Sequence, residues 1–597
     1  MVEKHLVEVV NNRAAKYGHK TVFRFREAGL ESYSQYTWLQ LADHIKSVSR
    51  SLLKLGFNAT SRIGIFSDNR PEWTIADLGI MGIRGVVVPF FGNASIQQAK
   101  YIIDETGMEL LFVGNQEQLD KALWLMENTD SLKIVVVFPS KTIIPQLPSV
   151  YSWQDFLLLD KDLLLGARAE ELLSKAEEDD LATIIYTSGT TGEPKGVMLG
   201  QDNFIRCMQL HDYRLDVTDS DISLCFLPLS HIFERCWTFY MLFRGAINIY
   251  LENPKSVMQE LPLARPTLMC TVPRFFEKTY QGIKKEESNW PAFKQWIFNW
   301  AIETGNQCTE YRKDNRPIPV ILRIRRNIAD RLVLNKLRSI FGGRIRQMPC
   351  AGAAMRSDLI KFFHATGLFV NYGYGATETT ATVSCFKSDV YEFESCGTIM
   401  QGVSVRIGEN GEIHVKGPIV FKGYFNKPSE TSKVLKDGWY STGDQGHISV
   451  AGNLIMEDRI HDIFKTSVGK YVSPQKIELL LSQDPFIEQV LVIGDNQKHI
   501  TALIVPSFES LLTRFSGIFE INPDSYTLVN DNTVKQFFME RLEKLQDELN
   551  PHEKVVKFTL LPEPFSVENE SLTSTLKLRR KKIIEKYSSI VEKMYLS

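Results

Sequence analysis

The sequence has no excess of charge of either sign, because 69 lysines and arginines stand against 71 aspartates and glutamates, for a formal net charge of −2. A nucleic acid is therefore not expected as a partner, since a phosphate backbone is bound by a strongly basic surface. Glycine and proline are also few, at 37 and 24 of 597 residues, which excludes collagen-like and low-complexity chains. With 44% hydrophobic residues, the composition is that of a folded globular chain.

Cysteine is sparse, and the eight cysteines all lie between Cys207 and Cys396 without a CxxC motif. This pattern argues against a disulfide scaffold or a zinc site and favours reduced thiols in a cytoplasmic protein. No uncharged apolar run reaches the roughly 18 residues that a membrane-spanning helix needs. The first segment, MVEKHLVEVVNNRAAKYG, carries charges where a signal peptide is apolar, so we expect neither secretion nor a membrane span.

Between Thr21 and Ile249, short β-branched runs such as RIGIFSD, GVVVPFF and LATIIYTS alternate with longer helical stretches. This alternation predicts parallel strands with helices on the faces of the sheet. Residues 276–340 contain few turn signals and are expected to be mainly helical. After residue 389 short alternating strands follow, with hairpin signals at Asn410-Gly411 and Gly452-Asn453.

We therefore predict an α/β protein with a large N-terminal domain of doubly wound sheets, a small β-barrel-like subdomain and a small α+β C-terminal domain. The N-terminal domain is expected over residues 1–458, with mostly antiparallel strands over 389–458. Two strand-like runs, QVLVIGD and HITALIVPS, a charged helical run and a basic tail indicate that residues 462–597 form the C-terminal domain.

The most informative segment runs from Thr183 to Leu199 and reads TIIYTSGTTGEPKGVML. Its glycines let backbone N–H groups approach an anion closely, its hydroxyls add donors, and Lys195 adds a cation, which together suit a polyphosphate. It is not a Walker A loop, because the pattern GxxxxGK[ST] counted from Gly189 needs glycine at Pro194. The segment therefore predicts phosphate binding outside the P-loop class.

The string TSGTTGEPKG resembles the signature loop of the adenylate-forming superfamily, which includes acyl-CoA synthetases, luciferases and peptide-synthetase adenylation domains. Further motifs follow in the family order. YGATE, which begins at Tyr374, is similar to the family's YGxTE motif, and YSTGD, which begins at Tyr440, to its YxTGD motif. Asp458-Arg459 with DIFKTSVGKYVSPQKIE resembles the hinge and the start of the mobile C-terminal domain, and GEIHVKGPIVFKGYFNKP and LTSTLKLRR complete the series.

The resemblance implies a binding site for ATP and AMP. Tyr374 is expected to stack on adenine, Asp444 to accept hydrogen bonds from the ribose hydroxyls, and Arg459 to hold ribose or phosphate. Tyr372 stands where many relatives carry Asn or Gln. The residues that the resemblance implies for binding of ATP and AMP are Thr187, Ser188, Gly189, Thr190, Thr191, Gly192, Lys195, Ala351, Gly352, Ala353, Tyr372, Gly373, Tyr374, Gly375, Thr377, Asp444 and Arg459.

The resemblance also implies catalytic roles. Lys577 corresponds to the family lysine that bridges the substrate carboxylate and the α-phosphate, where a cation stabilises developing charge. Thr377 is expected to bond the α-phosphate, and Glu378 to hold Mg²⁺. His231 is either a gate for the carboxylate or a satisfied core histidine. Residues 459–461 form the implied hinge, in which His461 occupies a position usually held by Lys or Asp.

The segments LPLSHIFERCWTFYMLFRGA and TVPRFFEKTYQGI resemble the long-chain acyl-CoA synthetase subgroup. Phe233, Trp237 and Tyr240 fall at i, i+4 and i+7 on one helical face, which predicts either a wall of an acyl tunnel or ordinary core packing. Gly469 and Lys470 match the region where relatives admit the pantetheine arm of CoA.

The function that the resemblance implies is activation of a long-chain fatty acid with Mg·ATP to an acyl-adenylate and pyrophosphate, followed by displacement of AMP by CoA. A fatty acyl-AMP ligase and a CoA ligase for a medium-chain or aromatic acid stay open as alternatives, as does the choice between monomer and homodimer. A basic cluster predicts contact with CoA phosphates, peripheral contact with an anionic membrane, or a solvated helix face. It comprises Arg323, Arg325, Arg326, Arg331, Lys336, Arg338, Arg344 and Arg346.

Overall fold

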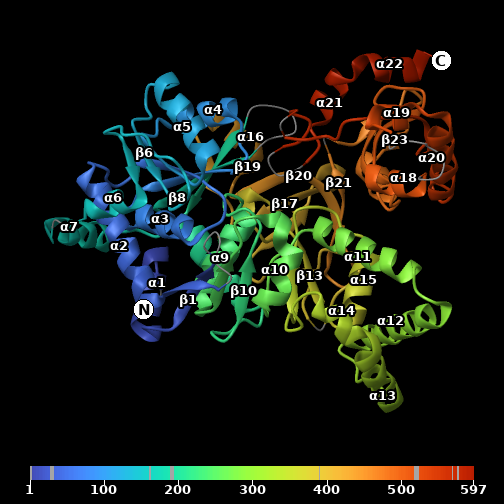
Figure 1. The fold of residues 1–597 in the computed structure, drawn as a ribbon, viewed down its shortest axis with the longest axis horizontal. Helices are drawn as coiled ribbons and strands as arrows, with labels where there is room; N and C mark the ends of the chain where they lie inside the picture. Colours follow the sequence, from blue (N-terminus) through green and yellow to red (C-terminus); the bar gives the residue numbers. More distant parts are fainter. Residues whose placement is uncertain are drawn as a thin grey trace.

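The computed structural model describes residues 3–26, 32–160, 163–187, 194–388, 390–460, 462–515, 523–567, 569–573 and 577–596. The larger N-terminal part contains two extended sheets with helices packed on them, and a smaller unit formed by the last part of the chain lies at one end (Figure 1). The predicted α/β class is therefore confirmed. Among the described helices, none combines the length and the apolar character needed to cross a membrane.

The first sheet has the strand order β18-β9-β8-β4-β3-β5-β6-β7. Neighbouring strands are parallel from β8 to β7, while β9 and β18 continue the sheet in antiparallel fashion. Val87 of β4 belongs to the main core and its neighbours Val86 and Val88 to the core on the opposite face, which explains the continuous apolar run. The strands are β3 (Arg62–Phe66), β4 (Val86–Phe90), β5 (Leu110–Val113), β6 (Ile134–Val137), β7 (Val150–Ser152), β8 (Leu181–Thr187), β9 (Lys195–Gly200) and β18 (Gly423–Tyr424).

The second sheet is assembled from two sets of strands, β2-β1-β11-β10 and β12-β13-β14-β15. Leu268 joins them, because it bridges Ser223 of β10 on one side and Gln347 of β12 on the other. The strands are β1 (Thr21–Phe25), β2 (Ser34–Thr37), β10 (Ile222–Cys225), β11 (Ile247–Tyr250), β12 (Gln347–Cys350), β13 (Phe369–Tyr374), β14 (Ser384–Cys385) and β15 (Thr398–Ile399).

Two buried helices, α3 (Pro71–Gly82) and α9 (Ile232–Arg244), contribute to the main core, which also contains residues of both sheets. Every residue of α3 is buried, including the carboxylates of Glu72 and Asp77. Arg235 of α9 donates hydrogen bonds to Asp77 of α3 and, at 2.8 Å, to Thr183 of β8. The two helices are thereby tied to the strand that leads into the signature loop.

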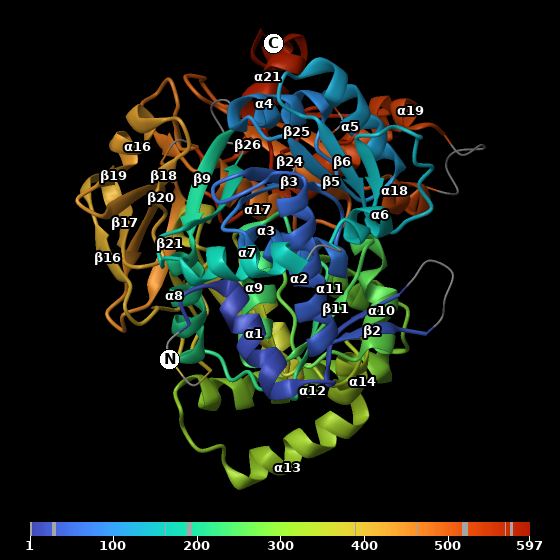
Figure 2. The same cartoon turned by 90° about the vertical axis from the view of Figure 1, so that its left-hand side faces the viewer.

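Other helices cover the outer faces of the sheets (Figure 2). They are α1 (Leu6–Tyr17), α2 (Trp38–Lys54), α4 (Ile96–Thr106), α5 (Gln116–Asn128), α6 (Trp153–Leu158), α7 (Leu163–Ser174), α8 (Gln201–Asp212), α10 (Val257–Ala264), α15 (Ser357–Thr366) and α16 (Pro428–Val434).

The helical character predicted for residues 276–340 is confirmed. The helix α12 packs against α13, and the pair extends to the lower edge of the molecule in both views (Figures 1 and 2). The elements are α11 (Pro273–Ser288), α12 (Ala292–Lys313), α13 (Val320–Ala329), the π-helical turn η2 (Asp330–Leu334) and α14 (Asn335–Ser339).

A separate antiparallel sheet has the order β16-β17-β20-β19, with β21 paired to β20. Both predicted hairpins are confirmed: β16 and β17 are joined around Asn410-Gly411, and β20 and β21 around Gly452-Asn453. Asn410 and Gly411 adopt φ of 56° and 75°, which these residue types tolerate in tight turns. The strands are β16 (Ser404–Ile407), β17 (Glu412–Lys416), β19 (Leu435–Lys436), β20 (Trp439–Ile448) and β21 (Leu454–Arg459).

The C-terminal unit contains a mixed sheet in the order β24-β25-β26 and a small hairpin of β22 and β23. Its strands are β22 (Phe464–Lys465), β23 (Tyr471–Val472), β24 (Ile487–Ile493), β25 (Ile500–Pro506) and β26 (Val555–Leu560). Its helices are α17 (Pro474–Leu481), α18 (Phe508–Arg514), α19 (Ser525–Asn530), α20 (Asn532–Leu545), α21 (Arg580–Lys586) and α22 (Ser588–Leu596).

Candidate active site

Tyr374, Asp444 and Arg459, predicted to bind one nucleotide, lie together although they come from three different strands. The Tyr374 hydroxyl donates to Asp444 Oδ2 at 2.6 Å, and Arg459 Nε lies 3.3 Å from Asp444 Oδ1. The register of β20 and β21 explains the second contact, because it pairs Asp444 directly with Arg459. Burial, and next the charge of Asp444, raise the pKa of Tyr374, so its hydroxyl stays a donor at neutral pH.

The YGATE motif forms a tight turn that presents Thr377 and Glu378. A side chain at Gly375 would place its Cβ 1.8 Å from the Ala381 carbonyl oxygen, so only glycine fits there. Thr377 and Glu378 lie in the 3₁₀ turn η3 (Thr377–Thr379), directly after β13. Glu378 Oε1 accepts a hydrogen bond of 3.0 Å from the Tyr424 hydroxyl, and desolvation raises the pKa of this carboxyl.

The two ends of the signature loop meet in the β8–β9 pair. Thr187 Oγ1 lies 3.5 Å from the Lys195 carbonyl oxygen, and Lys195 Nζ lies 2.8 Å from Glu430 Oε2 of α16. The same amine lies 5.1 Å from the ring centre of Tyr424, whose hydroxyl binds Glu378. Lys195 and Glu378 are therefore linked through one side chain. The other predicted loop residues, Ser188, Gly189, Thr190, Thr191 and Gly192, lie outside the described residues.

Lys577 reaches this group of residues from the far end of the chain. Its backbone is fixed by a hydrogen bond of 2.8 Å from Thr573 N to the Lys577 carbonyl oxygen. Desolvation, and next the charge of Arg459, lower the pKa of the Lys577 amine to about 8, although the charges of Asp444 and Glu378 act in the opposite direction. The fold thus brings the predicted catalytic lysine into the electrostatic environment of the predicted nucleotide residues.

His231 also lies near Lys577. Burial lowers the pKa of His231 to about 4, and the charge of Lys577 adds to this effect, so the imidazole is neutral at physiological pH. His231 Nδ1 accepts the backbone N–H of Phe233 at 3.3 Å and caps α9. The residue therefore has a structural role at the start of α9, and its position beside Lys577 is compatible with the predicted gate.

Tyr372 is buried and uses its hydroxyl within the protein. It donates to the Ala353 carbonyl oxygen and accepts from the Met355 N–H, both at 3.1 Å. Tyr372, which departs from the family pattern, thereby holds the segment of Ala351, Gly352 and Ala353 against β13. A direct contact of Tyr372 with AMP stays a prediction.

A small pocket lies between α9 and the second sheet. Phe233 and Trp237 are among its lining residues, whereas Tyr240 is not, and binding of an acyl chain there stays a prediction. Tyr240 is buried instead beside it, where its hydroxyl donates to Asp212 at 2.9 Å. The lining consists of His211, Leu215, Phe233, Trp237, Pro349, Cys350, Ala351, Asn371, Gly373, Tyr374, Ala381, Thr382 and Cys385.

The polar lining residues differ in their hydrogen bonding. His211 is satisfied, with Nδ1 2.7 Å from the Cys207 carbonyl oxygen and Nε2 3.1 Å from Thr382 Oγ1. Asn371 is 3% exposed, and its side-chain oxygen has no hydrogen-bond partner in the described part of the chain. Sequence reasoning missed Asn371, because its position beside YGATE does not reveal which way a strand residue points.

The predicted CoA residues are not joined to this group, whereas Arg459, the first residue of the predicted hinge, belongs to it. Gly469, with φ of 84°, and Lys470 form the turn between β22 and β23, and no hydrogen bond or ion pair among the described residues joins them to the surroundings of Lys577. Arg459 ends β21, and His461 lies outside the described residues.

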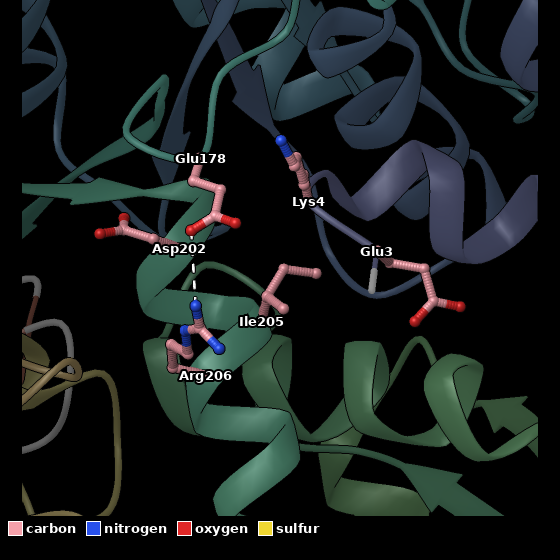
Figure 3. Close-up of a pocket in the computed structure, with 6 residues that line it drawn as sticks. All are labelled: Glu3, Lys4, Glu178, Asp202, Ile205 and Arg206. Atoms are coloured by element: carbon pink, nitrogen blue, oxygen red, sulfur yellow. Dashed lines mark hydrogen bonds and ion pairs between the residues drawn. The ribbon is translucent and has the colours of Figure 1, made fainter. Parts of the chain in front are cut away.

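A second, shallow pocket lies elsewhere, at the start of α8 (Figure 3). Its lining residues include none of the predicted site residues, and Arg206 and Glu178 form an exposed ion pair of 3.4 Å there. The lining consists of Glu3, Lys4, Glu178, Asp202, Ile205 and Arg206. This depression is therefore separate from the candidate active site.

Comparison with known sequences agrees with this geometry. Residues 10–425 match the family of AMP-binding enzymes, and residues 461–597 match the AMP-binding enzyme C-terminal domain. The long-chain-fatty-acid–CoA ligase FadD15 of Mycobacterium bovis is 30% identical, with 94% of this chain and 92% of that protein covered. Long-chain-fatty-acid–CoA ligase 1 of Cavia porcellus is 31% identical, covering 94% of this chain and 82% of that protein.

Solved structures share the fold. The adenylation domain of a carboxylate reductase from Mycobacterium chelonae superimposes with a TM-score of 0.76 at 20% identity, covering 99% of this chain and 91% of that one. The anthranilate CoA ligase AuaEII in complex with anthranoyl-AMP gives a TM-score of 0.74 at 16% identity, with 99% of both chains covered. From its motifs, its fold and these matches, the chain belongs to the family of AMP-binding enzymes, within the adenylate-forming superfamily.

Proposed function

We propose that the protein is an AMP-forming ligase that converts a long-chain fatty acid and ATP into an acyl-adenylate and pyrophosphate, and then transfers the acyl group to CoA with release of AMP. One observation carries the proposal: Lys577 lies in the electrostatic environment of Arg459, Asp444 and Glu378. This arrangement supports the role that we assign to Lys577, because a cation beside these residues would stabilise the negative charge that develops during attack of a carboxylate on the α-phosphate.

Within this proposal, the residues around Asp444 orient the nucleotide. Asp444 can accept from the ribose hydroxyls, Arg459 can donate to ribose or phosphate, and the Tyr374 ring offers a face for adenine. Thr377 sits at the turn that also holds Glu378 and is assigned to the α-phosphate. For the second step we assign the turn of Gly469 and Lys470 to the pantetheine arm, which requires rotation of the C-terminal unit about residues 459–461.

Glu378 is the residue that we assign to Mg²⁺. No cluster of three or more His, Cys, Asp or Glu side chains suited to a metal is found in the described ranges. One carboxylate is nonetheless a fitting donor set, because Mg²⁺ commonly takes one or two carboxylates and completes its shell with substrate phosphates and water. When bound, the ion would neutralise charge on the ATP phosphates.

The pKa of Lys577 predicts an alkaline limit of the first step. At pH values above about 8 the free enzyme carries a neutral amine there, so kcat/KM for acyl-adenylate formation should fall roughly tenfold per pH unit. Arg retains its charge through this range, and Lys577→Arg should therefore lose this alkaline limb whatever its absolute rate. Pyrophosphate exchange measured between pH 6 and 10 tests this, and identical profiles for both proteins would contradict it.

The unsatisfied Asn371 predicts a change in substrate preference. The Asn371 side-chain oxygen is buried and unpaired with or without an alkyl chain beside it, whereas a hydroxyl on the bound acid can donate to it and recover about 1–3 kcal/mol. Asn371→Leu should thus lower kcat/KM about 5- to 100-fold for acids that carry a hydroxyl along the chain, and should change it little for saturated acids. An unchanged ratio between the two acids would show that Asn371 does not face the bound chain.

The experiment that tests the proposed function is ATP–pyrophosphate exchange with acids from acetate to C18, with aromatic and amino acids as controls and Mg²⁺ omitted in one series. We expect a maximum with long-chain acids and no exchange without the metal. A maximum with an aromatic or medium-chain acid would replace the proposed substrate, and exchange without any acid dependence would refute the assignment.

A further inference from the structure

The pair of α12 and α13 carries an apolar row that faces solvent. Ile321, Ile324 and Ile328 of α13 are 76%, 56% and 48% exposed, and Leu332 of η2 is 48% exposed. Spacings of three and four residues place these side chains along one side of a helix. In both views α13 forms the lower end of the molecule, at the opposite end from α22 (Figures 1 and 2).

The basic cluster predicted from the sequence divides into two groups. Arg326 donates to the Ala365 carbonyl oxygen, Arg338 binds Asp330, and Arg346 binds Asp221, so these three cations stabilise the fold locally. Other members have no carboxylate within 4.0 Å in the part of the chain that the structure describes. These members are Arg323, Arg325, Arg331, Lys336 and Arg344.

We propose that α13 and η2 form a docking surface for an anionic lipid bilayer, with the isoleucine row entering the interface and the unpaired cations meeting the headgroups. Charge complementarity favours this occupant, because Arg323, Arg325, Arg331 and Lys336 lie on the same helical segment as the row, in a chain whose net charge is only −2. An amphipathic helix of this composition lies in the plane of such an interface. Membrane binding by this surface does not depend on the proposed function. Only the use of the surface to collect a fatty acid dissolved in the membrane rests on the proposed function.

Co-sedimentation with vesicles tests the surface. The full chain should bind vesicles of phosphatidylcholine with about 30% phosphatidylserine, and release them as salt is raised. Ile324→Asn/Ile328→Asn should lower the partition coefficient about tenfold, and Arg323→Gln/Arg331→Gln should weaken its salt dependence. The matched control is Ile143→Asn/Leu147→Asn, which replaces side chains 82% and 48% exposed outside this surface and should bind like wild type.

Three results would overturn the proposal. The first is wild-type protein in the supernatant with both anionic and neutral vesicles, and the second is a loss of binding in the control variant as large as in the α13 variant. The third is a change from dimer to monomer in the α13 variant, measured by sedimentation velocity, while neither protein binds vesicles, which would make the row an interface between copies of this chain. Ligase activity on detergent-dispersed acid should stay within about twofold of wild type in each variant, so failure of the surface is distinguishable from failure of the proposed function.

Discussion

Replacing Lys577 by alanine is expected to lower the rate of acyl-adenylate formation by about 100- to 1,000-fold, while thioester formation from supplied acyl-adenylate stays within about threefold of wild type. The physical reason is that, in the proposed function, the cation near Arg459, Asp444 and Glu378 acts where charge develops on the α-phosphate. In the same proposal the C-terminal unit rotates once the adenylate exists, so the second step no longer depends on this amine.

Single-turnover assays of the two half-reactions measure this difference directly. Lys581→Ala is the matched control, because Lys581 is an exposed lysine of the neighbouring helix α21 and should leave both steps unchanged. Equal losses in both steps for Lys577→Ala would contradict the assigned role and would indicate a general disturbance of the C-terminal unit.

The second large effect that we expect is a loss of stability when a buried ion pair of the core is broken. Asp77→Ala should lower the free energy of unfolding by about 3–5 kcal/mol, because it leaves the Arg235 guanidinium uncompensated inside the protein. The side chains of this ion pair are only 0% and 1% exposed, and Arg235 Nε lies 2.8 Å from Asp77 Oδ2. Arg235 also binds Thr183 of β8, so loss of the pair should disturb the entry to the signature loop as well.

Urea or guanidinium unfolding of the apo protein tests this prediction, with Glu178→Ala as the control. Glu178 pairs with Arg206, but these side chains are 45% and 42% exposed, and such a pair contributes at most about 1 kcal/mol. A destabilisation of Asp77→Ala no larger than that of Glu178→Ala would mean that Arg235 finds other partners in the core.

Sequence reasoning was most successful where function fixes residue type and order. YGATE, YSTGD and the Asp458-Arg459 pair each contributed residues that the fold brings together, because the antiparallel register of β20 and β21 sets Asp444 opposite Arg459. The two hairpins were predictable for a similar reason, since Asn-Gly and Gly-Asn pairs suit the backbone of tight turns. Motifs and turns of this kind can therefore be recognised in a single sequence.

Long-range packing could not be predicted in the same way. The partner of Arg235 is Asp77, 158 residues away, and nothing in either local sequence indicates the other. The helical spacing of Phe233, Trp237 and Tyr240 places all three on one face of the helix. Only the first two line the pocket, because the hydroxyl of Tyr240 donates a hydrogen bond to Asp212 of α8. Tyr372 was judged by the family pattern alone, whereas its hydroxyl holds the segment of Ala353.

The measurement that tests the central claim most directly is the product balance of one reaction mixture containing a labelled long-chain acid, ATP, Mg²⁺ and CoA. The proposed function predicts acyl-CoA, AMP and pyrophosphate in equal amounts, with acyl-adenylate accumulating when CoA is omitted. Formation of ADP and phosphate, or release of AMP and pyrophosphate without any acyl-CoA, would contradict it.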